Sequence, residues 1–165
     1  MPAFLMCAVD LSALSISSFK REPDGEATIS FCRSFRIENI ALQNKGLGPV
    51  LVMPTESGGY KNLIIVSRVL DGQIKRCFSS ACKAQKCAAA VKFKVKSAHL
   101  FKSKKGIVAT VNFDGEFDAV FLASKFARDG EDTFRIKYPK DLKFEDSALK
   151  EQVRSALIKE ARKHL

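Results

Sequence analysis

A near-repetition of one short segment constrains this chain more than any other feature. Residues 27–35 read ATISFCRSF, and residues 109–117 read ATVNFDGEF, about half a chain length further on. A period of that size indicates that one structural unit has been duplicated. Two β-branched segments that end in Phe can also match by chance, so the flanking residues have to decide the question.

The segments around the two copies show the same order of features. An alternating apolar run precedes each copy and ends at a glycine-bearing turn, with Gly25 in the first half and Gly106 in the second. Strand, turn and strand in this order predict a β-hairpin. Each half continues with a third strand, a glycine loop and a short strand that ends at Pro54 or Pro139.

The tips of the two repeated segments differ in residue type. Asp114 and Gly115 supply the positive φ angles that a tight hairpin turn requires. The first copy has Cys32, Arg33 and Ser34 in the same place.

Each half ends in a segment with helical periodicity. Residues 72–84 align with residues 151–163 without a gap. Ser147, with two acidic residues directly before it, suits the N-terminal end of the second helix. One apolar stripe runs along this helix, formed by Leu149, Val153, Ala156, Leu157 and Ala161. We therefore predict an α+β fold of two repeats, residues 1–88 and 89–165, each an antiparallel β-sheet followed by a C-terminal helix.

The first half resembles the SpoVG septation-regulator family over about residues 12–84. The resemblance rests on the order ATISF, FRIENIAL, NKGLG, VLVMP and GGYKN. Residues 51–54 match the family's hydrophobic-x-hydrophobic-Met-Pro strand. Residues 58–62 keep the aromatic and basic positions of the turn that follows but not its acids, and the His-Pro that usually opens the helix is absent. The second half looks like a divergent copy.

This resemblance implies a small α+β fold that works as a homodimer in bacterial regulators of septation and cell division. It also implies site-selective DNA binding, with RNA binding in some members. A tandem copy would then be a single-chain pseudo-two-fold dimer, in which fusion keeps the second copy at high effective concentration and lets the halves diverge. Lys61, the basic position of the matching turn, is carried over as a candidate contact.

Composition indicates a folded protein outside the membrane. Hydrophobic residues make up 46% of the chain, which is enough for a core. No apolar run approaches the roughly 20 residues of a transmembrane helix, and the N-terminal segment lacks the basic start of a signal peptide. We therefore expect a cytoplasmic protein. The five-residue spacing of Cys77, Cys82 and Cys87 does not suit a metal site, so free or buried thiols are expected.

The positive charge is confined to one part of the chain. The formal net charge is +10, and the segment 72–113 has ten basic residues and no acid. Within it, Lys92, Lys94 and Lys96 alternate with apolar residues, which places the lysines on one face of a strand. Such a row is equally typical of a solvated edge strand. The long acid-free stretch favours the phosphate backbone of a nucleic acid.

Lysines predominate over arginines in this segment, which favours backbone contact over base readout. Among these residues Arg76 is the best suited to contact a base, because an arginine side chain can form two hydrogen bonds with guanine. The complete set of candidate nucleic-acid contacts is Lys61, Lys75, Arg76, Lys92, Lys94, Lys96, Lys102, Lys104 and Lys105.

The sequence contains no pattern typical of an enzyme or a cofactor site. It has only two histidines, and its glycine loops lack the Lys-Ser/Thr that follows a phosphate-binding loop. We predict a non-enzymatic, nucleic-acid-binding bacterial regulator without cofactors that acts on DNA, or on RNA. Two alternatives stay open. The basic face could dock an acidic protein partner in cell division or septation, or the duplication could serve stability alone.

Overall fold

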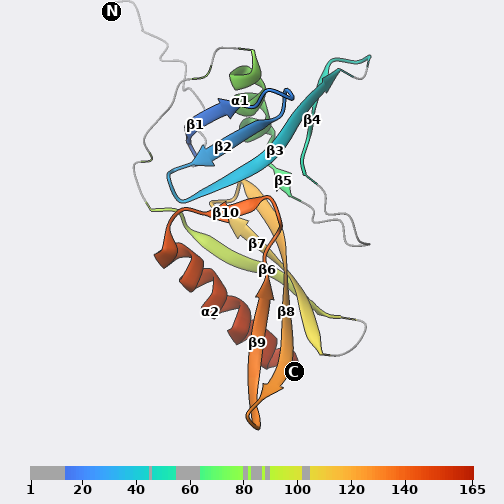
Figure 1. The fold of residues 1–165 in the computed structure, drawn as a ribbon, viewed down its shortest axis with the longest axis vertical. Helices are drawn as coiled ribbons and strands as arrows, with labels where there is room; N and C mark the ends of the chain where they lie inside the picture. Colours follow the sequence, from blue (N-terminus) through green and yellow to red (C-terminus); the bar gives the residue numbers. More distant parts are fainter. Residues whose placement is uncertain are drawn as a thin grey trace, which may run out of the picture.

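The computed structural model describes residues 14–44, 46–54, 64–79, 82, 87, 90–101 and 105–165. It is an α+β structure with antiparallel sheets and a C-terminal helix (Figure 1). The first half contains β1 (Ile16–Arg21), β2 (Ala27–Phe31), β3 (Phe35–Asn44), β4 (Pro49–Val52), β5 (Ile65–Val66) and α1 (Arg68–Phe78). The second half contains β6 (Phe93–Leu100), β7 (Gly106–Phe113), β8 (Phe117–Arg128), β9 (Glu131–Lys137), β10 (Leu142–Phe144) and α2 (Ser147–His164).

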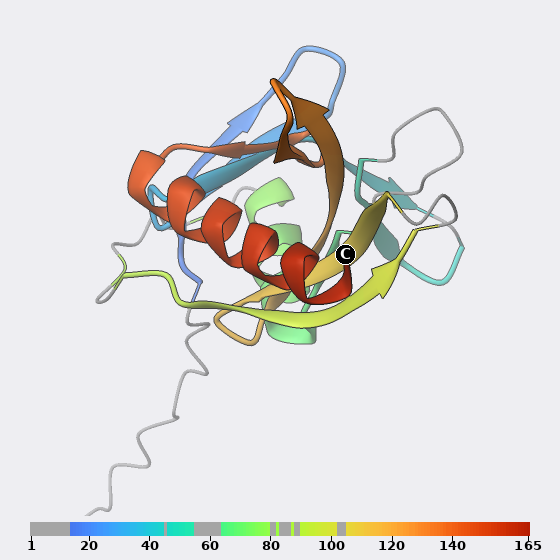
Figure 2. The same cartoon turned by 90° about the horizontal axis from the view of Figure 1, so that it is seen from below.

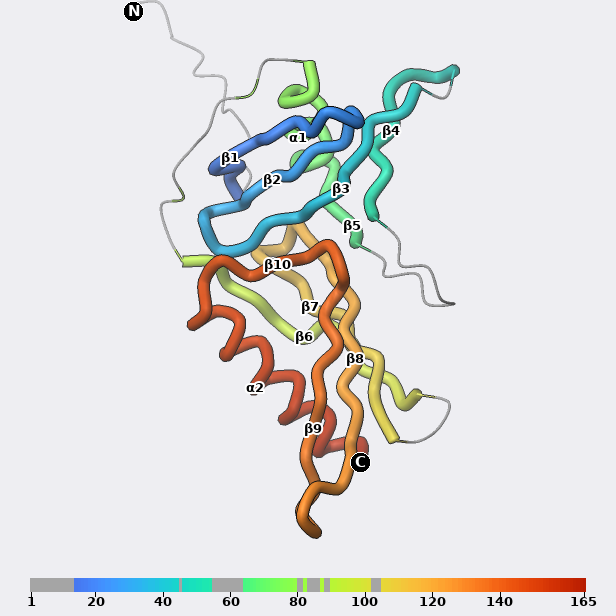
Figure 3. Tube along the Cα trace, viewed as in Figure 1, coloured from blue at the N-terminus to red at the C-terminus, as the bar shows by residue number. Residues whose placement is uncertain are grey.

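The two sheets each take one strand from the other half of the chain (Figure 3). One sheet has the order β1-β2-β3-β10, with β4 also paired to β3, and the other has the order β5-β8-β7-β6, with β9 paired to β8. Phe144 of β10 lies opposite Phe35, and Val66 of β5 lies opposite Phe117. The halves are therefore interlocked. The predicted domain boundary at residues 88 and 89 lies outside the described residues and stays a prediction.

The hairpin turns at the two repeated segments have the same backbone conformation. Asp114 and Gly115 have φ angles of 51° and 75°, as the sequence predicts for a tight turn. Cys32 and Arg33 have φ angles of 52° and 53° in the first copy. Left-handed backbone costs a residue with a side chain about 1–2 kcal/mol. The first turn is supported by the backbone bond from Cys32 to Ser15, at 3.0 Å.

An aromatic cluster joins the halves at the centre of the core. The ring centroid of Phe35 lies 5.1 Å from that of Phe113 and 5.3 Å from that of Phe117, and all three side chains are fully buried. Phe31 lies 5.6 Å from Phe35 on the first-half side. These are the phenylalanines of the repeated segments. Large buried rings dominate core energetics, so this cluster stabilises the contact between the halves.

The helices begin and end differently from the prediction. The α1 helix spans Arg68–Phe78 instead of 72–84, because the Ser67 hydroxyl caps its first turn by accepting a bond from the Leu70 N–H at 3.1 Å. The α2 helix is capped by Asp146. Figure 2 shows the second sheet curving around α2. The buried positions of the helices correspond in the gap-free alignment: Leu70, Ile74 and Phe78 with Leu149, Val153 and Leu157.

Two further expectations are wrong, one about the cysteines and one about Gly106. Disulfides join Cys32 to Cys87 and Cys77 to Cys82, so four of the five cysteines are not free thiols. The expectation of unpaired thiols rested on a reducing compartment, and the fold brings both pairs of cysteines within disulfide distance.

Gly106 is the first residue of β7 and is not among the positive-φ residues of the turns. Position 106 requires glycine because the backbones of β7 and β8 lie close together there. A Cβ at this position would lie 2.8 Å from the Ala123 carbonyl oxygen. The sequence pattern predicts this glycine in the turn before the strand, and that position is wrong by one element.

Candidate nucleic-acid interface

The lysine row, defined as Lys92, Lys94 and Lys96, lies on and just before β6 with exposed side chains. Phe93 and Val95, which alternate with it, are partly buried against the core. The predicted alternation is therefore confirmed. The β6 strand forms one edge of the second sheet, so the row is reached from solvent along that edge.

An acidic residue from outside the acid-free segment approaches this row. The Asp118 carboxylate on β8 accepts a bond from Lys96 Nζ at 3.0 Å and from Asn112 Nδ2 at 2.6 Å. Partial burial by itself raises the pKa of this carboxyl. The bonds from Asn112 and Lys96 and the charges of Lys96 and Lys94 outweigh burial, so the pKa of Asp118 lies below its ordinary value. Lys96 is therefore already paired, and the row is less positive than its sequence implies.

The first end of the row lies beside the β7–β8 turn. Asp114 Oδ1 accepts a bond from the backbone N–H of Lys92 at 3.2 Å. Next to this contact is a cavity of about 300 Å³, and its lining residues are Lys92, Phe93, Lys94, Asn112, Asp114 and Gly115. Two lysines and one aspartate therefore lie together at this end of the row.

The other predicted contacts do not gather around the row. Lys105 is exposed at the far end of the β6–β7 hairpin. Lys75 forms an ion pair with Asp71 at 2.8 Å, and Arg76 is exposed on α1. This helix packs against β1 and β4, and Figure 1 shows it in the opposite half of the molecule from β6. Lys61, Lys102 and Lys104 lie outside the described residues.

A second basic surface lies where the two halves meet, and the sequence did not predict it. We name it the junction groove, a cavity of about 580 Å³ that is bounded by β3, the β9–β10 segment and the start of α2. Its basic lining residues are Arg36, Lys137, Lys140, Lys143 and Lys150. Its other lining residues are Ile136, Tyr138, Pro139, Leu142 and Phe144. None of the lining residues in the described part of the chain is acidic.

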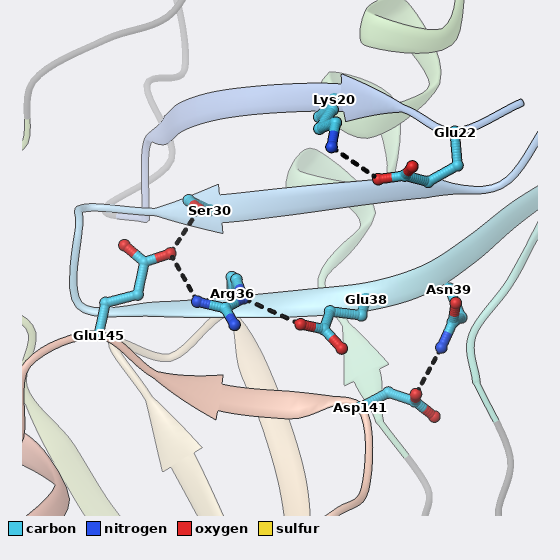
Figure 4. Close-up of polar contacts among 8 residues, drawn as sticks. All are labelled: Lys20, Glu22, Ser30, Arg36, Glu38, Asn39, Asp141 and Glu145. Atoms are coloured by element: carbon cyan, nitrogen blue, oxygen red, sulfur yellow. Dashed lines mark hydrogen bonds and ion pairs between the residues drawn. The ribbon is translucent and has the colours of Figure 1, made fainter.

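Polar contacts between the halves fix one wall of this groove (Figure 4). Arg36 on β3 donates to Glu38 at 3.0 Å, and its terminal nitrogen lies 4.0 Å from Glu145. Glu145 Oε1 also accepts a bond from the Ser30 hydroxyl at 2.7 Å. These contacts hold the guanidinium of Arg36 in place beside Lys143, its cross-strand neighbour.

The loop between β9 and β10 is anchored by a further contact between the halves. Asn39 has a φ of 59°, a conformation that Asn tolerates, and its amide donates to Asp141 at 2.6 Å. The Asp141 backbone carbonyl accepts a bond from the Glu38 N–H at 2.9 Å. The loop is therefore anchored to β3 through both the side chain and the backbone of Asp141.

Tyr138 forms part of the floor of the groove. Its hydroxyl oxygen is buried and has no hydrogen-bond partner among the described residues. Burial raises the pKa of this phenol above its ordinary value. Lys150 Nζ lies 5.0 Å from the centre of the ring, within the range of a cation–π contact. Lys150 is thereby held over the groove by the ring below it.

Two properties bear on what the protein contacts. In the part of the chain that the structure describes, no three His, Cys, Asp or Glu side chains are arranged to hold a metal ion. Neither described helix is long and apolar enough to cross a membrane. Comparison with known proteins identifies no relative: no family model, no curated protein and no solved structure matches this chain.

Proposed function

We propose that this protein is a non-enzymatic regulator that binds the phosphate backbone of a nucleic acid through the lysine row. The observation that carries the proposal is the exposed alternation of Lys92, Lys94 and Lys96 along β6, the edge strand of the second sheet among the described residues. Lysine acts as a point charge that neutralises a phosphate and releases its counterions. Contact with the backbone, without strong base selectivity, is the expected mode.

The proposal includes a SpoVG-like tandem fold, a pseudo-two-fold dimer within one chain. Three observations support it. Five strands and a helix occur in the same order in both halves, and each sheet receives one strand from the other half. In addition, the N-cap residue of each helix makes an equivalent bond to the hairpin turn of the other half. The Ser67 N–H donates to the Glu116 carbonyl at 2.7 Å, and the Asp146 N–H donates to the Ser34 carbonyl at 3.1 Å.

The test compares two variants with the same loss of charge. Lys92/Lys94→Gln removes two positive charges from the row and leaves the pair of Lys96 and Asp118 in place. Lys159/Lys163→Gln removes two positive charges from exposed positions of α2 that are not part of the row, one of them, Lys163, paired with Glu160 as Lys96 is with Asp118. Binding of a fluorescent single-stranded RNA and a duplex DNA is measured for both at low salt. Circular dichroism confirms that both variants are folded.

We expect the row variant to lose about tenfold in affinity, since each charged contact contributes on the order of 1 kcal/mol or more, and the control to lose much less. The RNA-to-DNA ratio then identifies the preferred nucleic acid. Equal losses in the two variants would mean that net charge alone attracts the ligand. If neither nucleic acid binds, docking to an acidic protein partner becomes the leading function, with a shallower dependence on salt.

The proposal places the protein in the bacterial cytoplasm, and the cysteine pairs provide a test. Thiols are kept reduced in that compartment, whereas disulfides persist in oxidising ones. Alkylation of thiols in freshly lysed cells, followed by mass spectrometry, should label all five cysteines in a cytoplasmic protein. Protection of Cys32, Cys77, Cys82 and Cys87 would contradict the cytoplasmic assignment and would favour the two disulfides of the structure.

A further inference from the structure

We propose that the junction groove is a second anion site, one that takes the phosphate group of a nucleotide unit. Neither the lysine row nor the family resemblance points to this surface. The inference extends the proposed function to a second site. Only the binding of a polynucleotide in the groove rests on that function. A nucleotide can bind in the groove even if the lysine row binds nothing.

Charge is the first argument. Five basic side chains from two halves of the chain line one cavity, and the described lining contains no carboxylate. Four carboxylates lie close to it: Glu38 and Glu145 contact Arg36, Asp141 lies in the β9–β10 loop, and the charge of Glu151 acts on Tyr138. The five basic side chains still outnumber these four carboxylates, which leaves a small surplus of positive charge. An anion is the ligand that such a surface binds, because it relieves the repulsion among the clustered cations.

Hydrogen-bonding capacity is the second argument. The Arg36 Nε donates to Glu38 at 3.0 Å, whereas the contact of its terminal nitrogen with Glu145 is 4.0 Å long, beyond hydrogen-bond range. A guanidinium has five N–H donors, so the terminal ones are available to a ligand. Lys143 lies directly across from Arg36 in the β3–β10 pair. A fixed guanidinium beside an ammonium matches the oxygens of a phosphate.

The size and the walls of the groove are the third argument. Its volume of about 580 Å³ is in the range of small-ligand pockets and exceeds what an isolated phosphate ion fills. Ile136 and Phe144 are partly buried and contribute apolar surface next to the cations. Apolar surface and clustered cations together suit a ligand that carries a base or sugar as well as a phosphate. A nucleotide unit, free or within a strand, has that composition.

The experiment titrates three probes into the whole ¹⁵N-labelled protein and follows its amide resonances. The probes are pyrophosphate, ATP and a short single-stranded oligonucleotide. The variant is Lys140/Lys143→Gln, which removes two exposed charges of the groove and leaves Arg36 and the contact of Asn39 with Asp141 intact. The matched control is Lys159/Lys163→Gln, and thermal unfolding verifies that both fold.

We expect ATP to shift the amides of residues 136–138 and 140–144, with about tenfold weaker binding in the groove variant and little change in the control. Shifts with pyrophosphate and ATP identify a site for free nucleotide phosphates. Shifts with the oligonucleotide alone identify a backbone contact. The inference is overturned if no probe moves these resonances, or if the control loses as much affinity as the groove variant. The proposal for the lysine row is tested separately. If that proposal is wrong, Lys92/Lys94→Gln will leave the affinity for the oligonucleotide unchanged.

Discussion

The lysine row and the junction groove are both basic, but they are built in different ways. The row comes from one strand, and its charge is concentrated in consecutive sequence. The groove is assembled from Arg36 in the first half and four lysines of the second half, between residues 137 and 150. In the folded protein Asp118 pairs with Lys96 of the row, and Glu38 pairs with Arg36 of the groove.

This difference shows that a basic run in sequence is not the same as a basic surface. Residues 72–113 contain no acid, yet Asp118 reaches the row from two strands away, across Asn112. Around the groove the segment that contributes the lysines also contains acids, and there Asp141 faces Asn39 while Glu145 faces Ser30 and Arg36. At each surface the fold therefore brings acids to one of the cations, Lys96 in the row and Arg36 in the groove.

The largest expected effect comes from breaking the junction that forms the groove. Phe35→Ala removes a fully buried ring that contacts Phe113 and Phe117. Truncation of a buried Phe typically costs about 3–5 kcal/mol. We expect chemical denaturation to show this loss in a single transition, because the halves share one core. Two separate transitions, with the second half unaffected, would mean that the row and the groove are structurally independent.

A smaller loss is expected where β7, the neighbour of the row's strand, approaches β8. Gly106→Ala places a Cβ 2.8 Å from the backbone oxygen of Ala123, and backbone cannot move aside easily. Overpacking of this kind costs about 1–3 kcal/mol in the free energy of unfolding. Gly72→Ala in α1 is the matched control, since its Cβ would meet only the end of the Arg76 side chain, at 4.0 Å.

The control should change stability in the opposite direction, by about 0.5–1 kcal/mol, because Ala is the better helix former. Thermal denaturation shows whether each variant is more or less stable than the wild type. A Gly106→Ala protein as stable as the wild type would show that β7 and β8 are not as close as described.

Removal of the Asp118 carboxylate should make the lysine row more positive and leave the junction groove unchanged. Asp118→Asn releases Lys96 from its ion pair and removes the negative charge near Lys94. We expect polynucleotide affinity to rise by a few-fold at low salt, since roughly one more phosphate contact becomes available to the row. Fluorescence anisotropy measures the change. A fall in affinity would mean that Asp118 orders the row for binding instead of weakening it.

The lowered pKa of Asp118 also predicts how the stability of the protein depends on pH. The pKa of Asp118 is lower in the folded protein than its ordinary value of 3.8, so its contribution to stability is present above that value. The contribution is lost as the pH falls through the folded pKa. Urea denaturation across the acid range should therefore show a steeper loss of stability in the wild type than in Asp118→Asn. Identical profiles would contradict the pairing with Lys96.

The smallest effect is expected at the floor of the groove. Tyr138→Phe removes a buried hydroxyl that has no partner among the described residues, so stability should change by less than about 0.5 kcal/mol or increase slightly. The raised pKa of the phenol predicts stability that is present below pH 10 and lost as the pH rises further, and the variant should lack this loss. A destabilisation above about 1 kcal/mol would indicate that the hydroxyl has a partner.

Local elements of the fold could be read from the sequence. The hairpins, the long third strands and α2 follow from alternation, glycine positions and a regular apolar stripe, as at Val153 and Leu157. The backbone of Cys32 and Arg33 follows from alignment with Asp114 and Gly115, although neither residue type favours a left-handed conformation. These features depend on contacts between near neighbours in the chain.

Features that depend on contacts between the halves were not predictable. The β5 and β10 strands have only two and three residues, too few for any periodicity, yet they interlock the sheets. The position of Arg36 beside Lys143 requires that interlocking. The lysine row was predictable because it is local to one strand. The junction groove was not, because no single segment contains it.

The most direct test of the central claim is the salt dependence of binding to a single-stranded oligonucleotide. Each phosphate contact contributes a slope of about −0.7 in log K against log salt. If the row contacts phosphates, Lys92/Lys94→Gln should make the slope shallower by about 1.4 than in the wild type. Identical slopes for the two proteins, or a wild-type slope near zero, would contradict the claim that the lysine row binds the nucleic-acid backbone.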